Sequence, residues 1–214
     1  MAYTTIDNSE LYFQTKIYTG NGSTQAITLD GDEDMQPDFV WIKDRDATNS
    51  HRLTDSVRGV EKELYSNQTY TEDPNGGLTA FGSDGFSLNS NGSYNGNTVK
   101  YVAWNWKAGG SASSNSDGSI TSTVSASTDA GFSIVSYTGN AGATETIGHG
   151  LGAVPSVIIV KRRSTTGDWI FYHKDVGNDG NLKLNTTNAK LTGITWRSTT
   201  PTSSVFTVGE DGGA

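Results

Sequence analysis

One apolar stretch occurs twice in the chain, and this repetition constrains the fold more than any other feature. Residues 37–43 read Pro-Asp-Phe-Val-Trp-Ile-Lys, and residues 155–161 read Pro-Ser-Val-Ile-Ile-Val-Lys. Each copy places a proline before a short run of β-branched and aromatic residues. This is the pattern of a buried β-strand, because proline is tolerated at a strand's first position, where no ladder N–H group is needed. Both stretches therefore predict strands.

The segments around the two stretches also match, at a spacing of 118 to 120 residues. Four pairs of corresponding residues keep this spacing: Tyr18 and Tyr137, Pro37 and Pro155, Leu64 and Leu182, and Phe86 and Phe206. Four matches at nearly one spacing predict that the chain is a tandem duplication. At 214 residues, each copy then has the usual size of a small domain.

Turn residues recur about every ten residues, and no segment has a sustained helical pattern. The sequence therefore predicts an all-β protein of two tandem antiparallel β-sandwich domains, jelly-roll or concanavalin-like, with a short N-terminal arm. The arm covers residues 1–12, the first sandwich 13–108, a Ser/Gly/Thr-rich linker 109–131, and the second sandwich 132–214. Inside the linker, Ile120–Val124 has the alternation of an edge strand. Residues 52–66 predict a strand, a loop and a second strand, as does their counterpart in the second copy.

The first copy ends with a strand pattern over Tyr101–Lys107, whose counterpart would fall near position 220, after Ala214. A second sandwich without this final strand leaves a sheet edge open, which proteins seldom tolerate. Either the natural protein continues beyond Ala214 or another chain supplies the strand. We favour continuation.

Composition and charge exclude several classes of function. The net charge of −8 argues against nucleic-acid binding, which requires clustered Lys and Arg. The chain has no cysteine, so it has neither a disulfide framework nor a thiolate metal site. No apolar run approaches the roughly 20 residues that span a bilayer, so membrane insertion is not expected. No export signal opens the sequence.

Two residue patterns resemble functional sites, a calcium loop and a set of catalytic histidines, but neither has the residues that such a site requires. Asp30–Asp34 carries the alternating carboxylates of a calcium loop, but Met35 stands at the sixth position, where the EF-hand pattern needs glycine. A solvated acidic turn is the favoured interpretation. The histidines His51, His149 and His173 lie far apart and outside any catalytic motif, so structural or surface roles are favoured. We predict no catalytic residue, no cofactor and no metal.

Two groups of aromatic and apolar residues are candidate binding residues. Trp104 and Trp106 could form a stacking platform for a glycan, although core packing on a face shared with Val102 is the favoured interpretation. The arm residues that could dock on a particle are Tyr3, Ile6, Leu11 and Tyr12. Fraying of the terminus is the competing interpretation for the arm.

Several short segments of the sequence resemble one known module. They are found at residues 37–43, 51–59, 64–67, 84–88, 101–109, 148–152, 155–163 and 201–206. Together they resemble the tandem β-sandwich module of marine bacteriophage virion proteins, found in fibre and tail-associated polypeptides. The resemblance covers nearly the whole chain from residue 13 and brings no catalytic residues with it.

The resemblance implies a non-enzymatic virion structural protein that is assembled in the host cytoplasm. A tail fibre or tail-associated subunit that contributes to host attachment is the favoured role. The expected partners are other tail or capsid proteins, further copies in a homotrimer, and a host surface glycan. The alternatives are a capsid decoration or head fibre protein, a stand-alone lectin-like carbohydrate-binding module, and a glycan depolymerase.

Overall fold

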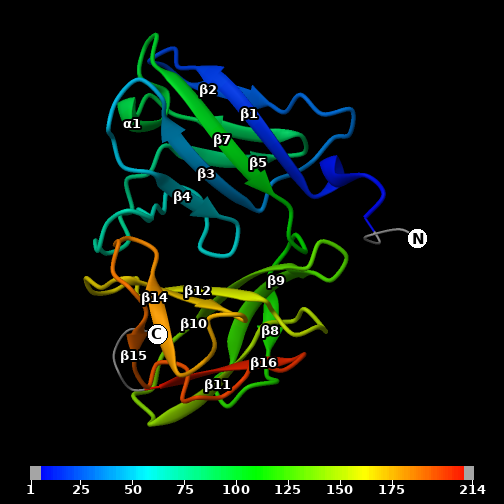
Figure 1. Cartoon of the computed structure of the whole chain (residues 1–214). Helices are drawn as coiled ribbons and strands as arrows, with labels where there is room; N and C mark the ends of the chain where they lie inside the picture. The colour runs from blue at the N-terminus through cyan, green and yellow to red at the C-terminus, as the bar shows by residue number, and fades with distance from the viewer. Residues whose placement is uncertain (1–5, 210–214) are drawn as a thin grey trace. The chain divides into compact units, whose positions relative to one another are not determined.

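The computed structural model describes residues 6–209, which form antiparallel sheets joined by turns, with almost no helix (Figure 1). The prediction of an all-β protein is confirmed. The described residues fall into two compact units. Unit 1 contains the residues up to Tyr65 together with Glu72–Ser111, and unit 2 contains Ser66–Thr71 together with the residues from Ala112 onward.

Unit 1 contains two sheets and two short helical turns. Its elements are η1 (Ser9–Leu11), β1 (Phe13–Thr19), β2 (Gln25–Thr28), β3 (Phe39–Asp44), β4 (Arg52–Asp55), β5 (Leu78–Gly82), β6 (Gly85–Leu88), α1 (Gly92–Asn95) and β7 (Lys100–Trp106). One sheet has the strand order β1-β7-β3-β4, and the other has the order β2-β6-β5. The last strand in sequence, β7, therefore lies between β1 and β3.

The core of unit 1 takes alternate residues from both sheets. Val40 and Ile42 on β3 pack with Tyr101 and Ala103 on β7, and Phe86 on β6 belongs to the same cluster. This alternation follows from the two-residue period of a strand, which directs every second side chain to one face. At the turn into β6, Gly85 has a φ of +119°, and a Cβ there would lie 2.0 Å from the carbonyl oxygen of Ile27. Only glycine fits this turn.

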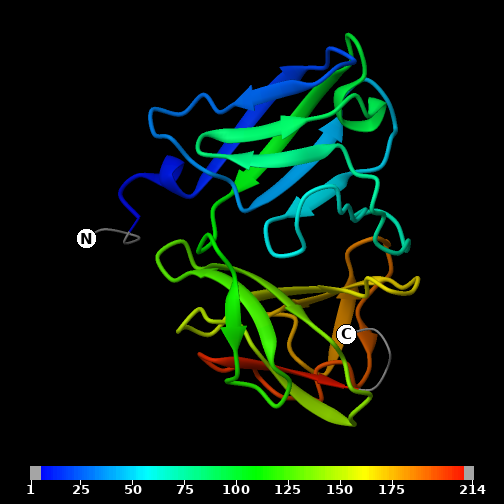
Figure 2. The same cartoon turned by 180° about the vertical axis from the view of Figure 1, so that it is seen from behind.

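Unit 2 is built from the remaining strands. They are β8 (Ser113–Asn115), β9 (Ser122–Ser127), β10 (Phe132–Tyr137), β11 (Thr144–Gly148), β12 (Val157–Lys161), β13 (Trp169–His173), β14 (Gly180–Lys183), β15 (Leu191–Thr192) and β16 (Val205–Gly209). Their sheet orders are β10-β9-β8, β12-β13-β14-β15 and β11-β16. Figure 2 shows the same strands from behind.

The strand pairs repeat between the units at the spacing found in the sequence. Val40 on β3 faces Thr54 on β4, and the residues 118 positions later, Ile158 on β12 and Tyr172 on β13, face each other in the same way. Likewise, the pair of Ile27 on β2 and Phe86 on β6 returns as Ile147 and Phe206 on β11 and β16. The duplication is thus visible in the strand register as well as in the sequence.

Two expectations about the strands need correction. Part of the segment expected to be a linker, residues 109–131, forms β8 and β9. The strand β9 overlaps the edge strand expected over Ile120–Val124, but it lies between β10 and β8, because Val124 and its neighbours pair with both. The second strand expected within residues 52–66 is reduced to isolated bridges at Glu63 and Leu64. Its counterpart in unit 2, β14, is a regular strand.

Candidate functional site

The most distinctive surface of unit 1 is a row of aromatic side chains on the outer face of the sheet β1-β7-β3-β4. We call it the aromatic face, and its members are Phe13, Phe39, Trp41, Trp104 and Trp106. Strand pairing brings them together, because Trp106 on β7 faces Phe13 on β1 and Phe39 on β3, while Trp104 faces Trp41. Phe13 is 37% exposed, and the other four are half-buried.

The rings of the aromatic face tilt against one another. The centroids of Trp106 and Phe13 are 4.9 Å apart with an interplanar angle of 53°, and those of Trp106 and Phe39 are 5.4 Å apart at 62°. Trp41 and Trp104 meet nearly edge to face, at 6.2 Å and 78°. Such pairs stabilise one another beyond the area they bury. The result is a firm apolar surface that is suited to binding.

His51 closes one end of this surface. Its Nδ1 accepts a hydrogen bond of 2.8 Å from the indole N–H of Trp41, and its ring lies nearly perpendicular to the indole at 5.7 Å. Burial and the nearby Lys43 ammonium group lower the pKa of His51. The imidazole is therefore a neutral acceptor that fixes the orientation of Trp41.

The favoured sequence interpretation of Trp104 and Trp106 as core residues was wrong. On β7 the inward residues are Tyr101, Ala103 and Asn105, which are fully buried, and the tryptophans point outward. Tyr101 occupies the inward position because its ring stacks on Tyr18 at 5.1 Å, with an interplanar angle of 14°. Sequence reasoning also missed Phe39 and Trp41. One pattern could have indicated them: the segments Phe-Val-Trp and Trp-Asn-Trp both place aromatic residues at alternate positions, which lie on one face of a strand.

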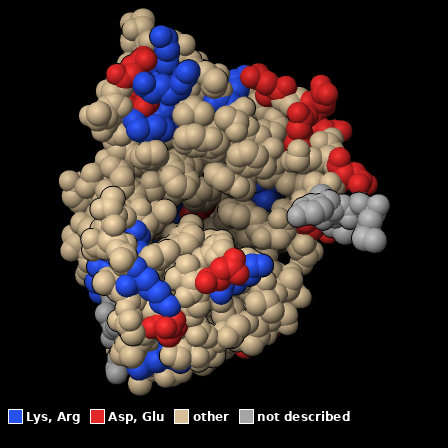
Figure 3. Space-filling view, in the orientation of Figure 1, with Lys and Arg blue, Asp and Glu red and all other residues tan. Residues whose placement is uncertain are grey.

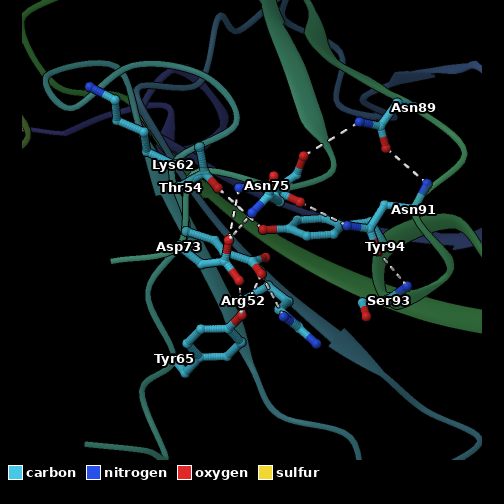
Figure 4. Close-up of polar contacts among 12 residues, drawn as sticks. Arg52, Thr54, Lys62, Tyr65, Asp73, Asn75, Asn89, Asn91, Ser93 and Tyr94 are labelled. Atoms are coloured by element: carbon cyan, nitrogen blue, oxygen red, sulfur yellow. Dashed lines mark hydrogen bonds and ion pairs between the residues drawn. The ribbon is translucent and has the colours of Figure 1, made fainter. Parts of the chain in front are cut away.

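A buried polar network lies near β4 and is the other candidate site (Figure 4). Arg52 Nη1 and Glu63 Oε1 form an ion pair at 2.7 Å, with only 14% and 3% of their side chains exposed. The Tyr65 hydroxyl donates to Glu63 Oε1 at 2.5 Å and lies 3.2 Å from Asp73 Oδ2. The Arg52 guanidinium also lies over the Tyr65 ring, 4.6 Å from its centroid.

This network stabilises the fold of unit 1. The backbones of Glu63 and Asp73 pair with each other, so the cluster joins both ends of the loop between them and ties that loop to β4. Burial and the hydrogen bond to Glu63 raise the pKa of Tyr65. A carboxylate that is 2% exposed and bound to Arg52 is closed to a substrate. The network is therefore a poor candidate for the carboxylate pair of a glycan depolymerase.

The N-terminal arm lies against its own unit from Asn8 onward. Asn8 caps η1, and the Glu10 carboxylate accepts a hydrogen bond of 2.7 Å from the Asp32 N–H group. The Asp30–Asp34 turn thus holds the arm, and Figure 3 shows acidic side chains grouped along this side of unit 1. Of the candidate docking residues, Ile6, Leu11 and Tyr12 are half-buried, and Tyr3 lies outside the described residues.

The other two histidines differ in their surroundings. His149 is 3% exposed, its Nε2 lies 3.2 Å from the Thr202 carbonyl oxygen, and its Nδ1 accepts from the Leu151 N–H group. Burial lowers the pKa of His149, so its neutral form fits this position. The side chain of His173 is 36% exposed and lies 3.7 Å from Asp175.

The described part of the chain contains neither a cluster of metal-ligating side chains nor a membrane-spanning helix. Among residues 6–209, no group of three or more His, Cys, Asp or Glu side chains is placed to hold a metal ion. No helix in this part of the chain is long and apolar enough to cross a membrane.

Comparison with known protein families finds a match over most of the chain. A family model described as a domain of unknown function (DUF7483) matches residues 8–214. Neither the curated proteins nor the solved structures contain a match.

Proposed function

The chain belongs to the DUF7483 family, whose function is unknown, and we propose that it is a structural protein of a bacteriophage particle. In this proposal it is a tail fibre or tail-associated subunit that contributes to host attachment. The resemblance of its short sequence segments to the marine phage virion module supports this role. The observation that carries the proposal is the aromatic face, a firm apolar surface on a unit built by duplication. Exposed apolar surfaces of this kind mark sites of association.

The proposal includes a finer description of the fold. Each unit is a jelly-roll or concanavalin-like β-sandwich, and in unit 1 the shared core of the sheets β1-β7-β3-β4 and β2-β6-β5 supports this description. Three copies assemble into a fibre, which covers apolar sheet faces and multiplies weak contacts with the host surface.

Mass spectrometry of phage particles tests this role. Particles of the phage that encodes the chain are purified through two successive density gradients, and peptides from both units are quantified against a known capsid protein. The proposal predicts a fixed copy number per particle that survives the second gradient. Loss of the chain from the particles in that step would overturn the proposal.

A second candidate is a stand-alone carbohydrate-binding module, and the outward position of Trp104 and Trp106 favours it. Aromatic ring faces on a sheet surface bind sugars by apolar stacking. This function predicts a measurable affinity for host polysaccharide that Trp104→Ala abolishes. Ile17→Ala is the matched control, because Ile17 is 59% exposed on the same sheet face and carries no ring. Equal binding by the two variants would remove the aromatic face as the glycan site.

A further inference from the structure

Four asparagines of unit 1 are each followed by glycine. The pairs are Asn21-Gly22, Asn75-Gly76, Asn91-Gly92 and Asn95-Gly96. In such a pair the backbone nitrogen of the glycine can attack the side-chain amide of the asparagine, because glycine has no Cβ that hinders the approach. The attack requires a glycine N–H group that is free to lose its proton. The hydrogen bonds of the four glycines therefore show which asparagine can react in the folded chain.

Three of the four glycine N–H groups are held by an acceptor. The acceptors for Gly22, Gly76 and Gly96, at 2.8 Å, 2.8 Å and 2.9 Å respectively, are the carbonyl oxygen of Asn95, the carbonyl oxygen of Glu61 and the hydroxyl group of Tyr101. Each of these hydrogen bonds must open before the glycine nitrogen can attack. The folded chain therefore protects three of the four asparagines that precede these glycines.

The N–H group of Gly92 is not held in this way. Among residues 6–209 it donates no hydrogen bond, because Gly92 is the first residue of α1 and the first N–H groups of a helix have no acceptor within it. Gly92 is also exposed, and a Cβ added there would have no atom within 4 Å. Water and hydroxide can therefore reach this nitrogen in the folded chain.

The side chain of Asn91 is held next to the Gly92 nitrogen. Its Oδ1 accepts a hydrogen bond of 3.0 Å from the Ser93 N–H group, and its Nδ2 donates one of 3.0 Å to the Asn75 carbonyl oxygen (Figure 4). Because Oδ1 is bound to the N–H group one residue after Gly92, the side-chain amide lies beside the Gly92 nitrogen. The Ser93 N–H group also stabilises the negative charge that develops on Oδ1 during an attack.

Asn21 provides a comparison within the same unit. Its Oδ1 likewise accepts a hydrogen bond, of 2.8 Å, from the N–H group two residues later, at Ser23. Asn21 is exposed, whereas Asn91 is half-buried, so exposure alone would make Asn21 the more reactive of the two. The two sites differ in the following glycine, since the N–H group of Gly22 is bound and that of Gly92 is free.

We propose that Asn91 is a site of spontaneous covalent modification in the folded chain. The Gly92 nitrogen gives its proton to hydroxide and forms a bond to Cγ of Asn91. The bond between Cγ and Nδ2 breaks, and Nδ2 takes up a proton and leaves as ammonia. Water then opens the resulting succinimide ring at either carbonyl group and leaves aspartate or isoaspartate. No group is oxidised or reduced, and the proposal does not depend on the proposed virion role.

The isoaspartate product changes the start of α1. The Asn91 carbonyl oxygen accepts hydrogen bonds from the Tyr94 N–H group at 3.0 Å and from the Asn95 N–H group at 2.8 Å. In isoaspartate the backbone runs through the side chain and is one methylene group longer, so this carbonyl moves away from both donors. Tyr94 is 1% exposed and belongs to the core of unit 1. The modification therefore loosens one end of that core.

Ageing of the full chain in mildly alkaline buffer tests the proposal. Tandem mass spectrometry with electron-transfer fragmentation locates each modified asparagine and distinguishes aspartate from isoaspartate. In the folded chain we predict that Asn91 reacts at least about tenfold faster than the other three asparagines, because a hydrogen bond that must open first raises their barrier. In urea all four should react at comparable rates. Equal rates at Asn21 and Asn91 in the folded chain would overturn the proposal, as would an unreacted Asn91.

Two variants separate the reaction from its effect on stability. Gly92→Ala places a methyl group beside the attacking nitrogen at a position with open space, so the reaction at Asn91 should slow by about tenfold or more while the chain stays folded. An unchanged rate in this variant would contradict attack by the residue 92 nitrogen. Asn91→Asp carries the charge of the product on a backbone of normal length. The isoaspartate form should unfold at a lower urea concentration than this variant, and equal midpoints would refute the effect on α1.

Discussion

The ion pair between Arg52 and Glu63 gives a sharp prediction about the stability of unit 1. Glu63→Gln keeps the size of the side chain but removes the charge that faces Arg52 at 2.7 Å. The guanidinium, whose side chain is 14% exposed, then lacks its buried counter-charge, and the Tyr65 hydroxyl loses its charged acceptor. Breaking one side of a buried pair costs roughly 3–5 kcal/mol. We expect the free energy of unfolding of unit 1 to fall by this amount.

The assay is urea unfolding followed by hydrogen exchange, because it reports on each unit separately. Amides in β4 measure unit 1, and amides in β13 measure unit 2, which should be unaffected. Asp30→Asn is the matched control, since Asp30 pairs with Lys16 in the same unit while 71% of its side chain is exposed. An exposed pair contributes no more than about 1 kcal/mol. If Glu63→Gln costs no more than Asp30→Asn, the assignment of the network as a stabilising element is refuted.

A double-mutant cycle separates the pair from its surroundings. Arg52→Met alone leaves Glu63 as a buried charge without its partner, and the double variant removes both charges. We expect the double variant to be less destabilised than the sum of the two single variants, with a coupling free energy of about 1–3 kcal/mol. Simple additivity would mean that the two side chains do not stabilise each other.

Two further predictions concern pH and backbone geometry. Burial lowers the pKa of His149, so the folded chain keeps a neutral ring while the unfolded chain takes up a proton below about pH 6.5. The free energy of unfolding measured in urea should therefore fall as the pH drops from 7 to 5, by at most about 1.4 kcal/mol per pH unit for this group. His149→Gln should reduce this dependence on pH. His173→Gln is the control at an exposed site, and equal slopes in the two variants would contradict the assignment. Gly85→Ala should lower the free energy of unfolding by more than about 2 kcal/mol, because it places a side chain at a positive φ and against the Ile27 carbonyl oxygen. Gly92→Ala should lower it by less than about 1 kcal/mol, because the space around Gly92 is open. Equal unfolding midpoints for the two glycine variants would show that the turn tolerates a side chain.

The strands could be predicted from sequence where pattern and turn signals agree. The strands β3 and β12 follow from the proline and the short apolar run that each contains. The spacing between the two copies can be read directly from the sequence, and the strand pairing keeps it. The hairpin of β5 and β6 likewise follows from Asp84-Gly85, a turn that requires positive φ.

The remaining features depend on tertiary contacts that local sequence does not encode. On β7 the outward residues Val102, Trp104 and Trp106 are more apolar than the buried Tyr101, Ala103 and Asn105, so the local alternation indicated the wrong face as the one that meets the core. The Ser/Thr-rich composition of residues 109–131 favoured a linker, and the alternation at Ile120–Val124 could not show that β9 lies between β10 and β8. Glu63 lies in the charged run Glu61-Lys62-Glu63, and nothing local distinguishes it as the buried partner of Arg52.

Immunogold labelling of purified phage particles tests the central proposal most directly. Antibody raised against residues 1–214 is applied to intact particles, with pre-immune antibody as the control. The virion proposal predicts gold at the tail or its fibres, which would place the chain in host attachment. Gold over the head would instead identify a capsid decoration or head fibre protein. Particles that carry no gold, while the antibody recognises the pure chain, would contradict the virion proposal and favour the free carbohydrate-binding module.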